Sequence, residues 1–148
     1  MTNASYRFSK IINAPVRFVY DWCTDYSAKD PNIPGAKQRR RIIEKTKNRA
    51  VYINQMKDAK TRTTVNIVKF HPPDRWHLDL IGEERNGTGE YRLRKVGPRR
   101  TRLDITLEMK WKIAEAPTRT EFHQYISSLW TKYVVALERD FVRNNASR

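Results

Sequence analysis

The sequence predicts an α+β fold, in which a seven-stranded antiparallel sheet packs on a long C-terminal helix. One observation is the strand pattern at 102–113, where apolar and polar residues alternate without error from Leu103 to Ile113. Another is the segment 118–143, where apolar residues recur at steps of three and four, as on one side of a helix. Both segments would span roughly 40 Å. A sheet that is apolar on one face, together with a helix of matching length, therefore predicts a sheet curled around that helix.

The N-terminal part predicts a strand followed by two short helices. The first strand covers 5–12, and Pro15 is typical of the first turn of a helix, with Asn13 or Ala14 as its cap. That helix would place Val16, Val19, Tyr20 and Cys23 on one face. A second short helix is expected over 25–30, before the breakers at 30–35.

The middle of the chain predicts strands separated by turn residues. Asn86-Gly87 indicates a hairpin turn, and Gly97-Pro98 another. Thr118 to Glu121 matches a capping box for the last helix. The remaining strands are expected over 37–46, 50–58, 61–70, 75–83 and 89–96.

Composition indicates one basic domain that covers residues 1–148. Thirty Lys and Arg against sixteen Asp and Glu give a net charge of +14, which favours anionic partners but also suits a generally solvated basic surface. The single cysteine, Cys23, excludes an internal disulfide and fits a reducing compartment. No segment matches a signal peptide or a membrane span, so we expect a cytoplasmic protein.

Several short motifs stand in a characteristic order along the chain. They are Ile12 to Tyr20, Asp25-Tyr26, the loop from Pro31 to Gly35, Trp76 to Leu80, Gly87 to Tyr91 and Thr101 to Leu103, followed by the terminal helix. In this order they resemble the START-like (SRPBCC) superfamily, which includes polyketide cyclase/dehydrase-like and birch-pollen-allergen-like proteins. The resemblance covers almost the whole chain and implies a helix-grip fold, often with a cavity for lipids, polyketides or sterols between sheet and helix. The glycine-rich loop of the plant allergens and an obvious catalytic pattern are missing, so the fold is better supported than any activity.

The inward-facing residues of the strands and of the last helix would line such a cavity. The same residues would equally suit a solid core with no ligand, as aromatic stripes often do. The candidates are Trp76, Leu78, Leu80, Tyr91, Leu93, Leu103, Ile105, Leu107, Met109, Trp111, Phe122, Tyr125, Ile126, Leu129 and Tyr133.

No catalytic or metal-binding constellation can be assembled from the sequence. The three histidines, His71, His77 and His123, have no cysteine or second histidine at ligand spacing, so we expect no metal and no cofactor. Cys23 follows Trp22 in an apolar helix and is expected to be a small buried residue. If the protein were a cyclase, Tyr91, Tyr125 and Tyr133 would be its acid–base candidates.

Basic residues cluster at Arg39, Arg40 and Arg41, and again at Arg92, Arg94 and Arg102. If strands 89–96 and 101–113 pair, the second cluster projects from one outer face of the sheet. That face could bind phosphate groups of a nucleic acid, or it could be laced with Arg–carboxylate pairs, since Asp104 and Glu108 interrupt it.

The expected function is binding or transport of a hydrophobic or amphipathic small molecule, such as a lipid or an acidic compound, rather than catalysis. Basic residues at the cavity mouth would capture the ligand, and peripheral contact with an anionic membrane would fit the charge. Two alternatives stay open: a polyketide cyclase/dehydrase-like enzyme, and a nucleic-acid-binding protein with a solid core. The sequence leaves the ligand and the oligomeric state undetermined.

Overall fold

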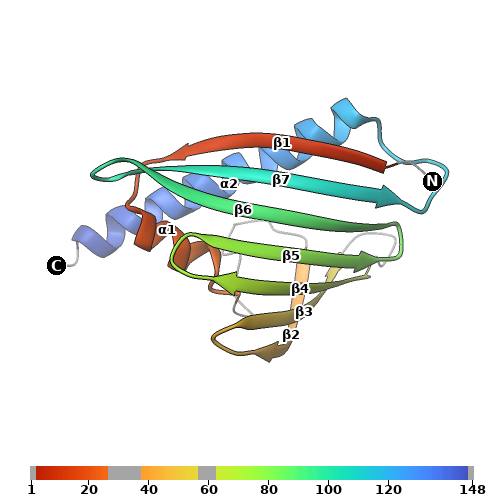
Figure 1. The fold of residues 1–148 in the computed structure, drawn as a ribbon, viewed down its shortest axis with the longest axis horizontal. Coiled ribbons are helices and arrows are strands. Elements are labelled where there is room, and N and C mark those ends of the chain that lie inside the picture. The colour runs from red at the N-terminus through yellow and green to blue at the C-terminus, as the bar shows by residue number, and fades with distance from the viewer. Residues whose placement is uncertain (1–2, 27–37, 57–62, 147–148) are drawn as a thin grey trace.

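The computed structural model describes residues 3–26, 38–56 and 63–146. Within these ranges the chain forms seven strands and two α-helices (Figure 1). In chain order they are β1 (Asn3–Ile12), α1 (Val16–Cys23), β2 (Gln38–Lys45), β3 (Arg49–Met56), β4 (Thr63–His71), β5 (Arg75–Gly82), β6 (Arg85–Gly97), β7 (Arg100–Trp111) and α2 (Arg119–Ala146). The predicted α+β class is confirmed. The second short helix expected over 25–30 falls mainly on residues outside those that the structure describes.

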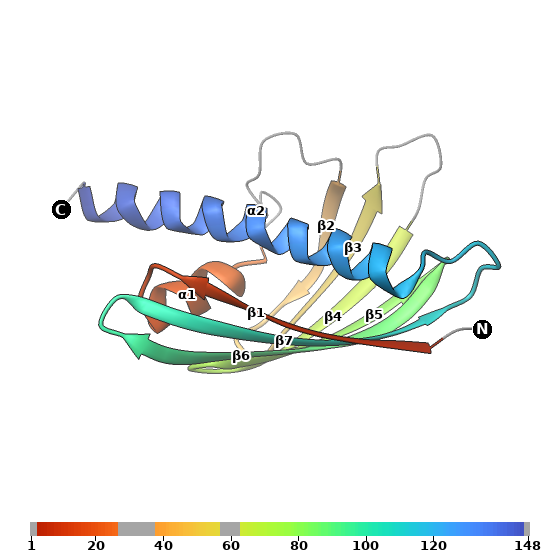
Figure 2. The same ribbon diagram turned by 90° about the horizontal axis from the view of Figure 1, so that it is seen from above.

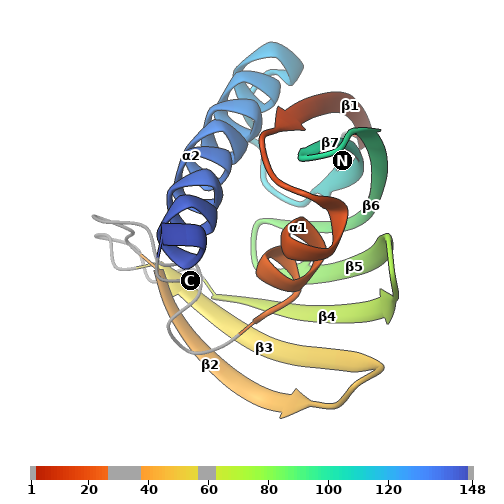
Figure 3. The same cartoon turned by 90° about the vertical axis from the view of Figure 1, so that its left-hand side faces the viewer.

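All seven strands belong to one antiparallel sheet with the order β1-β7-β6-β5-β4-β3-β2. Strands β2 to β7 follow one another as neighbours, and β1 pairs with β7 along its whole length, from Asn3 opposite Lys110 to Ile12 opposite Thr101. The right-handed twist of the strands accumulates across such a sheet and curls it. Figure 3 shows both helices inside the resulting curve.

The start of α1 differs from the prediction by one residue. Pro15 is the N-cap rather than part of the first turn, with an extended backbone at φ −70° and ψ 155°. Its carbonyl accepts a hydrogen bond from the Val19 amide at 3.0 Å. Proline suits this position because the cap needs only a carbonyl, and proline has no N–H to leave unpaired.

The predicted turn at Asn86-Gly87 is wrong, because both residues lie inside β6. The chain turns instead at Glu83-Glu84, directly after β5. Gly87 stands opposite Met109 on β7, and a Cβ atom at Gly87 would lie 2.3 Å from the Met109 Sδ. Glycine here lets the Met109 thioether pack close to β6 and does not mark a turn.

The N-terminus of α2 carries the predicted cap. The Glu121 amide donates to the Thr118 Oγ1 at 3.1 Å, and the Thr118 hydroxyl donates to the Glu121 carboxylate at 3.0 Å. These bonds satisfy one of the amides that a helix start leaves unpaired, and they fix the point at which α2 leaves the loop after β7.

Helix α2 is anchored at the β1 side of the sheet, where it contacts β1 and α1. Lys10 on β1 donates to the hydroxyl groups of Ser127 at 3.0 Å and Thr131 at 2.9 Å. On α1, the Trp22 indole donates to Asp140 at 2.9 Å. Figure 2 shows α2 crossing above the concave face while β2 to β5 fan away from it. The helix thus covers the β1 side of the concave face.

Candidate ligand-binding cavity

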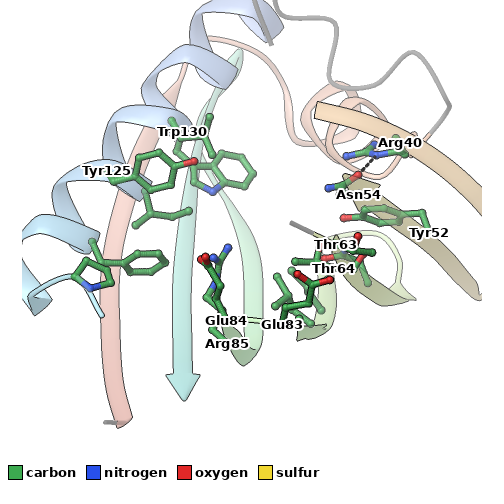
Figure 4. Close-up of a pocket in the computed structure, with 18 of the residues that line it drawn as sticks. Arg40, Tyr52, Asn54, Thr63, Thr64, Glu83, Glu84, Arg85, Tyr125 and Trp130 are labelled. Atoms are coloured by element: carbon green, nitrogen blue, oxygen red, sulfur yellow. Dashed lines mark hydrogen bonds between the residues drawn. The ribbon is translucent and has the colours of Figure 1, made fainter. Parts of the chain in front are cut away.

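A cavity of about 750 Å³ lies between the concave face of the sheet and α2 (Figure 4). Small-molecule sites in proteins typically have volumes of about 300–1,000 Å³. The cavity extends from β2, β3 and β4 on one side to α2 on the other, and the β5–β6 turn and the loop after β7 form its rim. The described residues therefore leave an open space between the sheet and α2.

The wall formed by α2 and the end of β7 is apolar and aromatic. Phe122 on α2 packs against Trp111 of β7, with ring centroids 5.2 Å apart. Trp130, one helical turn beyond Ile126, approaches Tyr91 of β6 at 5.7 Å. Phe122, Ile126 and Trp130 line the cavity together because positions four apart on α2 share one side of the helix.

The opposite wall, on β2, β3 and β4, is polar. Arg40 donates from Nε to the Asn54 Oδ1 at 3.4 Å, and its guanidinium carbon lies 4.4 Å from the ring centroid of Tyr52 and 5.5 Å from that of Tyr26. Asn66 on β4 lines the same wall although its side chain is buried. Figure 4 shows Arg40, Tyr52 and Asn54 grouped across the cavity from Trp130.

The buried tyrosines keep their protons. Burial raises the pKa of Tyr91 well above its ordinary value of 10.0, and the neighbouring Tyr52, Tyr133 and Cys23 raise it further. Burial likewise raises the pKa of Tyr26, and the nearby positive charge of Arg40 offsets this rise only in part. At neutral pH both hydroxyl groups can donate a hydrogen bond to a ligand, but neither is a phenolate that could act as a base.

Carboxylates dominate the described part of the rim. Glu83 and Glu84 come from the β5–β6 turn, and Glu115 and Glu121 from the loop after β7 and the start of α2. Arg85 lies beside them, with its guanidinium carbon 5.5 Å from the ring centroid of Trp111. The expected basic residues at the mouth are thus replaced, in the described residues, by a mainly acidic rim.

The predicted cavity residues divide into two groups. Those that line the cavity are Leu78, Leu80, Tyr91, Trp111, Phe122, Tyr125, Ile126, Leu129 and Tyr133. Those that lie in the packed core away from it are Trp76, Leu93, Leu103, Ile105, Leu107 and Met109. This second placement differs from the expectation because α1 packs against β6 and β7, and α2 against β1, so that part of the concave face is filled.

Sequence reasoning missed most of the polar wall and the rim. Period-two alternation could have placed Tyr52 and Asn54, or Thr64 and Asn66, on a common face, but their polarity suggested the solvent side. The other lining residues absent from the prediction are Trp22, Cys23, Tyr26, Arg40, Thr63, Gly82, Glu83, Glu84, Arg85, Ile113, Glu115, Pro117, Glu121 and Trp130.

The predicted basic surface also divides. Arg40 points into the cavity, while its neighbours Arg39 and Arg41 are exposed, because alternate strand residues face opposite sides. Arg92, Arg94 and Arg102 project outward as expected.

On this outer face, Asp104 of β7 forms ion pairs with two arginines. Asp104 pairs with Arg102 at 2.8 Å and with Arg94 at 3.3 Å. The hydrogen bond from Ser9, followed by the contact with Arg102, outweighs partial burial and holds the pKa of Asp104 below 3.8. Cross-strand Arg–carboxylate pairing therefore accounts for much of the charge at this end of the sheet.

The histidines lie apart from the cavity lining. His123 packs against the rings of Tyr6 and Phe8 on β1, with ring centroids 6.4 and 5.7 Å apart. His77 projects from the outer face and contacts Asp79 and Glu90. Among residues 3–26, 38–56 and 63–146, no group of three or more His, Cys, Asp or Glu side chains is placed to hold a metal ion.

No helix within the described parts of the chain is both long and apolar enough to cross a lipid bilayer.

The sequence matches no protein-family model and no curated protein. Solved structures nevertheless share its fold. Ara h 8.0201 superposes with a TM-score of 0.76 at 12% identity over 96% of this chain and 99% of that one. A START superfamily protein from Mycobacterium smegmatis superposes with a TM-score of 0.71 at 13% identity, over 94% of this chain and 97% of that one. The Zhui aromatase/cyclase from Streptomyces sp. R1128 superposes with a TM-score of 0.68 at 15% identity, over 97% of this chain and 93% of that one. The START-like helix-grip fold expected from the sequence is thereby confirmed.

Proposed function

We propose that this helix-grip protein binds an amphipathic small molecule with an acidic group in the cavity between its sheet and α2. The observation that carries the proposal is the division of the cavity into an apolar wall on α2 and a polar wall that contains Arg40. A ligand with an apolar body and one anionic end would match both walls at once. The likeness to an aromatase/cyclase supports the proposal, since such a protein acts on a small organic molecule.

Apolar burial would supply most of the affinity. A ligand that buries about 200 Å² of apolar surface against Phe122, Ile126 and Trp130 gains about 5 kcal/mol at 25 cal/mol per Å². A charge-assisted hydrogen bond from Arg40 would add about 1.5–3 kcal/mol. The guanidinium already packs against Tyr52 and is held by Asn54, so less side-chain entropy is lost when the ligand binds.

The charges around the cavity would also orient the ligand. The rim carboxylates of Glu83, Glu115 and Glu121 repel an anionic group, whereas Arg40 on the far wall attracts it. The acidic end would therefore point toward β2, with the apolar body between the sheet and α2. Tyr91, held in its protonated form, would donate a hydrogen bond to a ligand oxygen near the inner end.

Two dyes with the same ring system test this proposal. Anilinonaphthalene sulfonate carries an anionic group, and phenylnaphthylamine is its neutral counterpart; both fluoresce more strongly in apolar surroundings. We expect the protein to bind both and to prefer the sulfonate. Arg40→Gln should weaken sulfonate binding about tenfold, which corresponds to about 1.4 kcal/mol, and should leave the neutral dye almost unchanged.

Arg39→Gln is the matched control, because Arg39 neighbours Arg40 in β2 but is exposed. It should bind both dyes as the unmodified protein does. Equal weakening of both dyes by Arg40→Gln would mean that Arg40 shapes the cavity and does not pair with the acid. Failure of either dye to bind at all would contradict the proposed function itself.

A further inference from the structure

The convex face of the sheet carries an aliphatic patch behind the polar wall of the cavity. In the cross-strand register, Ile53 of β3 stands opposite Val65 of β4, and Val65 opposite Ile81 of β5, which forms one continuous row. Val51 and Ile67 form a second pair beside it. Ile81 is 52% exposed, and the other four are partly exposed. We call these five residues the aliphatic patch.

The patch reverses the usual pattern of an antiparallel sheet. Such a sheet normally turns apolar residues toward the interior and polar residues toward solvent. On β3 and β4 the inward residues at the cavity include Asn54 and Asn66, while the outward ones beside them include branched aliphatics. Figure 3 shows both helices on the concave side, so no described element covers the patch. Ile81 is the exposed member of the row and the other four are partly exposed, and a continuous row of aliphatic side chains on an outer face favours contact with a partner.

Cations surround the patch on the same outward face. Arg39 and Arg41 lie at its β2 edge, with Arg41 directly opposite Ile53. Arg49 of β3 and Lys69 of β4 stand directly opposite each other. Because Glu44 already pairs with Arg49, the positive charge beside the patch comes mainly from Arg39, Arg41 and Lys69.

Further along the outer face the same arrangement recurs. Arg75 of β5 stands opposite Arg92 of β6. Two carboxylates also border the patch: Glu44 stands opposite Val51 and pairs with Arg49 at 2.9 Å, and Asp79 stands opposite Ile67 and contacts His77. The outer face therefore carries an apolar row among charges of both signs, with cations in excess.

We infer that the aliphatic patch and its surrounding cations dock the protein on an anionic lipid surface. The aliphatic side chains would enter the acyl boundary, and the nearby Lys and Arg side chains would pair with anionic headgroups. A second copy of the chain fits less well, because it would bring the same cations face to face. A nucleic acid would use the cations but would leave the branched aliphatics without a partner.

Vesicle co-sedimentation tests the inference. The full chain is mixed with vesicles of phosphatidylcholine alone, or with vesicles that also contain phosphatidylserine. We expect binding to the anionic vesicles only. The double variant Ile53→Thr/Ile81→Thr keeps branched residues suited to strands and should bind these vesicles about tenfold more weakly. Arg39→Gln/Arg41→Gln should cause a loss of similar size.

The matched control for the aliphatic change is Val135→Thr/Val142→Thr on α2, where the two valines are 63% and 64% exposed but lie outside the patch. This variant should bind anionic vesicles normally. Undiminished vesicle binding by Ile53→Thr/Ile81→Thr would overturn the inference. So would a dimer in solution that the same variant dissociates, or RNA binding that replaces vesicle binding. All of these surface variants should still bind the dyes in the cavity. Loss of vesicle binding with dye binding retained therefore tests the membrane contact separately from the proposed ligand binding.

Discussion

The ring of Trp130 on α2 lies 5.7 Å from the ring of Tyr91 on β6, so helix and sheet touch across the inner end of the cavity. Tyr91 in turn stacks on Trp76, with centroids 5.0 Å apart and planes 3° from parallel. Trp76 is almost fully buried, so this aromatic series connects α2 to the rigid core. The contact limits how closely the helix can approach the sheet and thereby helps to keep the cavity open.

Replacing Trp130 should weaken this connection. Trp130→Ala is expected to lower the free energy of unfolding by about 2 kcal/mol, less than the 3–5 kcal/mol of a fully buried Trp, because Trp130 is only partly buried. Urea denaturation measures the effect. Trp130→Phe, which retains a ring facing Tyr91, should cost clearly less, and equal losses for the two variants would rule out a specific role of the ring contact.

A side chain at Gly87 should force the Met109 side chain to move. Gly87→Ala is expected to destabilise the fold by about 1–3 kcal/mol, because its Cβ would overlap the Met109 thioether. In a double-mutant cycle, the same change should cost less in a Met109→Ala background. Purely additive free energies would show that the clash with Met109 is not the cause.

The cap of α2 should make a measurable contribution to stability. Thr118→Ala removes the hydroxyl that accepts from the Glu121 amide and should cost about 1 kcal/mol in thermal or urea unfolding. Thr120→Ala, in the first turn of the same helix, serves as the control and should be neutral or slightly stabilising. A loss no larger for Thr118→Ala than for Thr120→Ala would contradict the capping role.

His77 should make stability depend on pH. Partial burial lowers its pKa, but the hydrogen bonds with Asp79 and Glu90 outweigh this effect and raise the pKa above 6.5. The stabilisation from His77 is then complete below pH 6.5 and is lost as the pH rises through the folded-state pKa. Unfolding of the unmodified protein and of His77→Gln should therefore differ more at about pH 5.5 than at about pH 8. A difference that does not change with pH would contradict this assignment.

The long elements were predictable because their periodicity is strong and agrees with their packing. The alternation from Leu103 to Trp111 marks β7, and the Thr118 cap marks the start of α2. Local signals failed where tertiary packing decides. Asn86-Gly87 has the composition of a hairpin turn, yet pairing with β7 places both residues inside β6.

The cavity was only partly predictable, since alternation tells which way a residue points and not what it meets there. Leu103 and Ile105 point inward as expected, but they are buried in the filled part of the concave face. The polar wall was hidden for a different reason. On β3 and β4, hydrophobicity suggests that Ile53 and Val65 face inward, whereas the structure turns them outward and places Asn54 and Asn66 at the cavity.

Blocking the cavity from α2 tests most directly whether the hollow interior binds ligand. Leu129→Trp adds bulk at a partly exposed lining position, and Val135→Trp adds the same bulk at a position 63% exposed on the same helix and outside the lining. Titration with anilinonaphthalene sulfonate should show at least a tenfold loss of affinity for Leu129→Trp, normal affinity for Val135→Trp, and similar thermal unfolding of both. Unchanged dye affinity in a folded Leu129→Trp variant would contradict binding in the cavity.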